Sequence, residues 1–139
     1  AGVLLLTLCD AETPLHLAGA HDCAAVRDWV VFHTGAPLVG AEKAMFALGD
    51  WAALQPLDRF PVGTAQYPDR STTLVVEMSA LEAGGATLSG PGIRERAALS
   101  LPEVAAFQRN AMLYPLGVDF YFTAGAQLAA LPRSITVEG

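Results

Sequence analysis

Thr72-Thr73-Leu74-Val75-Val76-Glu77-Met78 is the stretch of sequence that decides the fold class. It is rich in β-branched residues, which fit the pleated and half-buried surface of a strand. Ala83-Gly84-Gly85 follows it, and glycine is typical of turns. We therefore expect this strand to turn back into Ala86-Thr87-Leu88-Ser89 as an antiparallel hairpin.

The C-terminal part of the chain predicts a helix and a second hairpin. Ser100-Leu101-Pro102-Glu103 is a capping box with proline in the first turn, and it predicts a helix to about Met112 with Val104, Phe107 and Ala111 on one side. The apolar segments 117–123 and 127–131 predict a hairpin about Gly125. Pro132 makes 133–138 an edge strand or a terminal extension.

The N-terminal part predicts short elements of both kinds. Val3 to Leu8 is apolar and is compatible with a strand, although we favour the end of a helix. Leu15-His16-Leu17 alternates like a strand. Asp22 is expected to cap a helix to about Thr34, ended by Gly35 and Pro37, with one apolar face formed by Val26, Trp29, Val30 and His33.

The segment between this helix and the central strand predicts small, irregular elements. Segments 37–39 and 44–48 read as strand pieces around a polar turn. Asp50 is expected to cap a short helix, which Pro56 limits to little more than its first turns. The order of elements predicts a single α/β domain over residues 1–139, with a mixed sheet, antiparallel hairpins and flanking helices.

Composition indicates a folded chain with few charges. Of 139 residues, 53% are hydrophobic and only 16% are charged, against a typical charged share of about 25%. We therefore expect part of the surface to be buried against a partner, and a homodimer when the chain is alone. The net charge of −6 argues against nucleic acid, whose binding depends on Lys and Arg.

Cysteine usage and hydropathy indicate a cytoplasmic chain. Cys9 and Cys23 lack the spacing of a zinc site and make no disulfide framework, which fits a reducing compartment. The longest apolar run, Val3 to Leu8, is too short to span a bilayer.

Few residues carry a signal for catalysis or for a cofactor. His16, His21 and His33 are not clustered, so we predict no metal site, and His33 reads as a structural histidine at a helix end. Lys43 is the one lysine and lies on a predicted polar turn, which argues against a Schiff base with pyridoxal phosphate. The aspartates do not pair at a spacing that would place two carboxylates together. We predict no catalytic residues.

One segment has the composition of an anion site. Ser89-Gly90-Pro91-Gly92-Ile93-Arg94-Glu95-Arg96 offers glycine amides and two arginines that could hold a phosphate, although the lysine of a P-loop is absent. Gly90, Gly92, Arg94 and Arg96 are therefore weak candidate ligand residues. The alternative is a glycine-rich turn whose arginines are solvated or paired with acidic groups.

Several segments, taken in order, resemble the H subunit of the bacterial carbon-phosphorus lyase core complex. They cover essentially the whole chain, and their residues are Val3 to Leu8 with Thr13-Pro14, Phe32 to Val39, Gly63-Thr64-Ala65, Leu88 to Ile93, Tyr114 to Asp119, and Ala130 to Arg133. The family's chain begins earlier, with a helix and a strand that this sequence lacks.

The resemblance implies a fold and a role. Members of this family resemble the pyridoxal-phosphate transferase fold without its cofactor lysine, so no cofactor is implied. They act as subunits, with no activity of their own implied, in making ribose 1-methylphosphonate 5-triphosphate from ATP and methylphosphonate. The implied partners are the G, I and J subunits. The alternative function is a small enzyme or binding domain that uses Gly90 to Arg96 on a phosphorylated metabolite.

Overall fold

The computed structural model describes residues 2–64, 66, 71–78, 86–89, 97–99, 104–114, 116–124 and 127–138. Its helices are α1 (Gly2–Leu8), α2 (Ala24–His33) and α3 (Val104–Ala111), with short 3-10 turns η1 (Gly19–His21), η2 (Ala41–Lys43) and η3 (Leu57–Arg59). Its strands are β1 (Leu15–Leu17), β2 (Phe46–Gly49), β3 (Thr73–Glu77), β4 (Ala86–Ser89), β5 (Ala97–Leu99), β6 (Asp119–Ala124), β7 (Gln127–Leu131) and β8 (Thr136–Glu138).

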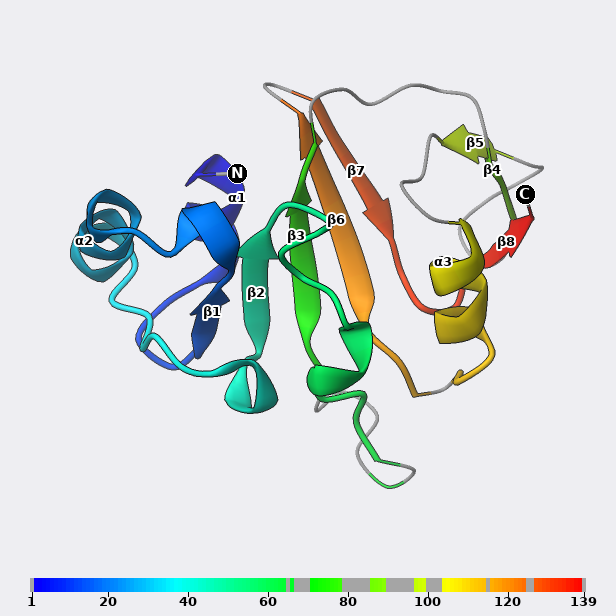
Figure 1. The fold of residues 1–139 in the computed structure, drawn as a ribbon, viewed down its shortest axis with the longest axis horizontal. Helices are drawn as coiled ribbons and strands as arrows, with labels where there is room; N and C mark the ends of the chain where they lie inside the picture. Colours follow the sequence, from blue (N-terminus) through cyan, green and yellow to red (C-terminus); the bar gives the residue numbers. More distant parts are fainter. Residues whose placement is uncertain are drawn as a thin grey trace.

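A five-stranded mixed sheet forms the centre of the molecule (Figure 1), in the order β1-β2-β3-β6-β7. The first four strands are parallel, and only β7 runs antiparallel to its neighbour β6. A parallel strand deep in a sheet is buried on both faces, which explains the continuous apolar run of β3. The mixed sheet and the β6–β7 hairpin confirm the α/β prediction.

The predicted hairpin between β3 and β4 is wrong. β3 pairs with β2 on one side and with β6 on the other, so both of its hydrogen-bonding edges are occupied. β4 instead lies between β5 and β8 in a separate three-stranded antiparallel sheet. The glycine turn at 83–85, on which the prediction rested, lies outside the described residues. β8 at the edge of the small sheet confirms the expectation for 133–138.

Two apolar clusters cover the two faces of the main sheet. On one face, Leu17, Leu48 and Val75 pack under α1 and α2. On the other face, Phe120 and Phe122 pack against α3 and the small sheet, in a cluster that also contains Leu54, Phe60, Leu74, Val76, Phe107 and Val137. Figure 1 shows α1 and α2 beside β1 at one end of the sheet, and α3 with the small sheet at the other.

Aromatic rings form the centre of the second cluster. Phe107 of α3 lies with its ring centroid 4.7 Å from that of Phe120 and 4.9 Å from that of Trp51. Offset and edge contacts of this kind add to the burial of apolar surface. These three rings therefore anchor α3 to the sheet.

The predictions for the N-terminal helix and for α2 hold in their spans, but the predicted cap of α2 does not. The apolar N-terminal run is helical, as favoured, and α2 ends at His33 before a left-handed Gly35. Cys23, not Asp22, is the N-cap of α2, and the Asp22 carboxylate instead pairs with the side chain of Arg27. His33 is exposed rather than on the buried face, and its ring lies tilted beside that of Trp29, with 4.9 Å between the ring centroids.

Two further expectations need correction. Asp50 accepts a bond from the amide of Ala53 at 2.8 Å, as a cap would, but 51–54 form only a turn. Segment 37–39 forms no full strand; it bridges β1 at Leu38 and shields that edge. The capping box at 100–103 lies outside the described residues, while α3 itself and its buried Phe107 confirm the helix that was expected there.

Candidate functional site

The sequence-predicted ligand residues are not described by the structure. Gly90, Gly92, Arg94 and Arg96 all lie outside the described residues, so their geometry contributes nothing to the site. Lys43 ends η2 with an exposed side chain, just before the amino end of β2. Over the described ranges, no group of three or more His, Cys, Asp or Glu side chains comes together as a metal site would require.

A cavity lies beneath α3. Its volume is about 550 Å³, and η3, α3 and the start of β6 form its walls. The walls are mainly apolar and include Leu57, Phe60, Val62, Leu113 and Val118. A cavity of this size and composition suits a small molecule or the apolar side chain of a protein partner.

A few polar groups lie among the apolar walls of this cavity. Asp58 and Arg109, both exposed, contribute one charge of each sign, and Gln55 and Asn110 contribute amides. Mainly apolar walls with a few polar groups are typical of sites that bind a ligand or a side chain.

An exposed apolar segment continues from the rim of the cavity. Leu113 lines the cavity, and its neighbours Met112 and Tyr114 point outward, with Met112 84% exposed. Contiguous exposed apolar surface is typical of protein interaction sites. We call the cavity together with 112–114 the α3 surface. The sequence signal for it is the run of apolar residues that continues past the end of the helix.

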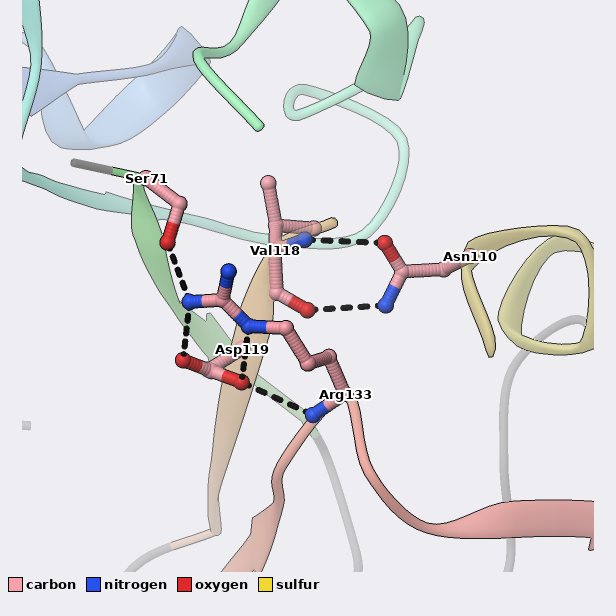
Figure 2. A network of polar contacts seen from close by, with 5 residues as sticks. All are labelled: Ser71, Asn110, Val118, Asp119 and Arg133. Carbon is pink, nitrogen blue, oxygen red and sulfur yellow. Dashed lines mark hydrogen bonds and ion pairs between the residues drawn. The ribbon is translucent and has the colours of Figure 1, made fainter. Parts of the chain in front are cut away.

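A pair of hydrogen bonds holds α3 against the start of β6 (Figure 2). The side-chain amide of Asn110 donates to the Val118 carbonyl at 2.8 Å and accepts from the Val118 amide at 2.9 Å. Asn110 is buried and both residues line the cavity. Sequence reasoning missed this contact, because nothing local to Asn110 indicates its partner.

A second polar network lies at the edge of the sheet where β3 and β6 begin (Figure 2). The Arg133 guanidinium donates to both carboxylate oxygens of Asp119, at 2.8 and 3.2 Å, and also bonds the Ser71 hydroxyl. The Asp119 carboxylate in addition accepts the backbone amide of Arg133 at 2.8 Å. This network ties the end of β7 to the starts of β3 and β6, and so fixes the wall from which the α3 surface is built.

Two titratable groups away from this surface have shifted pKa values. Burial raises the pKa of the Cys9 thiol, a hydrogen bond to Thr13 partly offsets this, and the charge of Asp10 adds to the rise. The hydrogen bond from Arg27 lowers the pKa of the exposed Asp22 carboxyl. A buried thiol of this kind is unreactive, so Cys9 is part of the core and not a nucleophile.

A second exposed apolar patch lies on α2. Phe32 is 84% exposed and Val31 is its exposed neighbour. A cavity of about 300 Å³ also borders α2, at Ala25, Val26 and Trp29. Its described lining does not include Val31 or Phe32, whereas the α3 surface combines exposed side chains with a cavity.

The family assignment follows from comparison with known proteins. The model of a family described as bacterial phosphonate metabolism protein (PhnH) matches residues 1–138. The chain belongs to the PhnH family. This confirms the resemblance found in the sequence, and it places the α3 surface in a protein of phosphonate metabolism.

Two curated relatives carry subunit names. A PhnH subunit of alpha-D-ribose 1-methylphosphonate 5-triphosphate synthase from Rhizobium meliloti (strain 1021) is 38% identical over 99% of this chain. A putative C-P lyase subunit protein, HtxG, from Stutzerimonas stutzeri is 28% identical over 94% of this chain. The chain spans 73% and 66% of the lengths of these two relatives. No helix in the described part of the chain is long and apolar enough to cross a membrane.

Proposed function

We propose that this chain is a non-catalytic docking subunit of a carbon-phosphorus lyase complex. In that role it supports the formation of ribose 1-methylphosphonate 5-triphosphate from ATP and methylphosphonate. The observation that carries the proposal is the 38% identity to a relative that is itself named as a subunit of the corresponding synthase.

The proposed partners are the G, I and J subunits in the cytoplasm, with a homodimer when the chain is alone. The low share of charged residues and the exposed apolar side chains of the α3 surface support an assembly role. We propose that the α3 surface receives an apolar side chain of the partner, because a buried anchor in a pocket is the usual centre of an interface.

The proposed evolutionary origin is a pyridoxal-phosphate transferase-like fold that has lost its cofactor. The largely parallel sheet with helices on both faces supports this reading. So does the position of Lys43, which is exposed and precedes the amino end of β2. In open α/β sheets, ligands bind beyond the carboxyl ends of the strands. Lys43 instead lies at the opposite edge of the sheet, beside the amino end of β2.

Co-purification tests the docking role. The tagged chain is expressed with the G, I and J subunits, and we expect all four to elute together. Met112→Ser and Tyr114→Ser should each reduce recovery of the partners without unfolding the chain. Phe32→Ser is the matched control, because Phe32 is as exposed as Met112 but lies on α2. Failure of the partners to co-purify with the unaltered chain would contradict the proposal, and an effect of Phe32→Ser alone would move the surface to α2.

A further inference from the structure

Three polar side chains from three segments meet at a cavity beside the carboxyl end of β1. His16 belongs to β1, Asp22 follows η1, and Arg27 lies in the first half of α2. The cavity has a volume of about 330 Å³, and residues 38–40 form its other wall. Figure 1 shows β1 and α2 at the end of the sheet away from α3. The cavity is therefore separate from the α3 surface.

The segment beside β1 holds the imidazole of His16 in one orientation. The Nδ1 atom lies 3.0 Å from the Val39 carbonyl, and because a carbonyl oxygen only accepts, Nδ1 carries the hydrogen of this bond. Val39 is fixed in turn, since its amide donates to the Leu15 carbonyl at 2.9 Å. The Nε2 atom of His16 makes no hydrogen bond within the described part of the chain, and it is not buried. It is therefore accessible to a ligand.

Asp22 and Arg27 form an ion pair that leaves further hydrogen-bonding groups open. The Arg27 Nε atom donates to one carboxylate oxygen of Asp22, and the side chains of Arg27 and Asp22 are 51% and 40% exposed. The hydrogen bond from Arg27 lowers the pKa of the Asp22 carboxyl most, and the charges of Arg27 and His16 add to the lowering. Asp22 is therefore ionised at neutral pH. Among the described residues, its second oxygen and the two terminal nitrogens of Arg27 make no hydrogen bond.

These three side chains present donors and acceptors side by side. Asp22 accepts hydrogen bonds and Arg27 donates them, while Nε2 of His16 accepts when the ring is neutral and donates when it is protonated. A hydroxyl group both donates and accepts, so it satisfies the ring in either state. The carboxylate disfavours an anion, and the guanidinium disfavours a cation. The set therefore fits an uncharged molecule with neighbouring hydroxyl groups.

We propose that this cavity binds an uncharged polyol, with one hydroxyl at His16 and others at Asp22 and Arg27. The apolar walls at Leu17 and Leu38 suit the C–H surface of a ring that carries these hydroxyls. Ligands of open α/β sheets bind beyond the carboxyl ends of the strands, and Leu17 is the last residue of β1. The proposal goes beyond the docking role and does not rest on it.

Nuclear magnetic resonance of the full chain tests this site with two matched rings. The compound myo-inositol is an uncharged ring with a hydroxyl on every carbon, cyclohexanol is the same ring with a single hydroxyl, and inorganic phosphate is the anionic comparison. We expect myo-inositol at millimolar concentration to shift the ring signals of His16 saturably and to leave those of His33, at the far end of α2, unchanged. Cyclohexanol should bind about tenfold more weakly or worse, because it lacks the second hydrogen bond, and phosphate should not bind. The absence of a saturable shift, equal binding of cyclohexanol, or tighter binding of phosphate would overturn the proposal.

Charge variants near the start of α2 complete the test. Asp22→Ala and Arg27→Ala should each weaken myo-inositol binding about tenfold, the effect of one hydrogen bond to a charged group. Both variants should fold, because an exposed ion pair contributes little to stability. Asp28→Ala is the control, since it removes an exposed carboxylate of α2 that is not part of the described cavity lining, and it should leave binding unchanged. If binding survives both substitutions at the ion pair, or falls equally in Asp28→Ala, the proposal is wrong.

Discussion

Asn110 on α3 pairs with both backbone polar groups of Val118, 2.8 Å from its carbonyl and 2.9 Å from its amide. The side-chain amide of Asn110 thereby pairs with Val118 as a neighbouring backbone segment would, at the point where the chain enters β6. Gly117 precedes this point with a φ of +124°, and a Cβ there would lie 2.9 Å from the Asn110 side-chain oxygen. The approach of α3 to the sheet thus depends on glycine at 117 and asparagine at 110 together.

Replacing Asn110 should destabilise the fold strongly. Asn110→Ala leaves the buried amide and carbonyl of Val118 without partners, and we expect a loss of about 2–4 kcal/mol in the free energy of unfolding. Denaturant titration measures it. Gln108→Ala on the same helix removes a single bond to Val137 and should cost less than about 1.5 kcal/mol. Equal losses in the two variants would contradict the double pairing.

The Arg133–Asp119 pair should show energetic coupling. The Arg133 side chain is 12% exposed and that of Asp119 is 31% exposed, so Arg133→Met leaves a partly buried carboxylate without its cation. We expect a loss of about 2–4 kcal/mol, and a smaller loss for Arg133→Lys, which keeps the charge but not the two-pronged geometry. A double-mutant cycle with Asp119→Asn should give a coupling energy of about 1–3 kcal/mol. Strictly additive losses would mean that the two side chains act separately.

The two cysteines should differ in reactivity. Cys23 is exposed and Cys9 is buried with a raised pKa, so a thiol reagent at mildly alkaline pH should modify Cys23 first. Cys9→Ser should leave the fast phase intact, and Cys23→Ser should remove it.

The raised pKa of Cys9 also predicts the sign of a pH effect on stability. Because the fold holds the thiol in its protonated form, the stabilisation is fully present below the unfolded value of about 8.5 and is lost as the pH rises through the folded pKa. Cys9→Ala should lose this alkaline dependence in denaturant titrations. A fall in stability on the acid side of neutrality, removed by Cys9→Ala, would contradict the burial of this thiol.

The glycine-arginine segment gives a prediction that rests on sequence alone. We expect Arg94→Ala and Arg96→Ala each to change folding stability by no more than about 0.5 kcal/mol, as at exposed positions. Calorimetry with ATP, ribose phosphates and methylphosphonate should show no measurable affinity for the isolated chain. If the segment instead holds a phosphate, either variant should weaken binding about tenfold or more, and the alternative function would be favoured.

The chain should not form a stable aldimine with pyridoxal phosphate. Lys43, the one lysine, is exposed and therefore lacks the desolvation that would lower its pKa for Schiff-base formation. Incubation followed by borohydride reduction, read by absorbance and mass, is the measurement. A stoichiometric adduct that disappears in Lys43→Ala would reverse the docking assignment in favour of an enzyme.

Local sequence was sufficient for most elements but not for their pairing. The β-branched run of β3 and the Gly35 stop of α2 are signals contained within a few residues, and both elements form where expected. β3 instead pairs with Phe46 to Gly49 of β2 and with Asp119 to Thr123 of β6. No local turn signal specifies either partner. A glycine turn after a strand predicts a change of direction, not the sheet that the next strand joins.

The polar contacts near the α3 surface were beyond sequence reasoning for the same reason. Arg133 finds Ser71 and Asp119 across large sequence separations, and each residue alone reads as an ordinary surface group. Asp22 shows the converse case: its position favoured a helix cap, but a nearby arginine competes for the carboxylate. The contact between His21 and Glu77 likewise depends on the parallel pairing of the strands, which brings the segment after β1 close to the end of β3.

The position of β3 between two parallel partners has a consequence for how the chain folds during synthesis. β2 precedes β3, but the other partner, β6, comes after β4, β5 and α3 along the chain. Until the ribosome has made β6, one edge of the apolar strand β3 has no partner, and unpaired strand edges promote aggregation. Sheets that depend on such distant pairing also fold slowly. The nascent chain therefore exposes this edge of β3 until Asp119 to Ala124 have been made. We expect chaperones to bind the nascent chain in that interval.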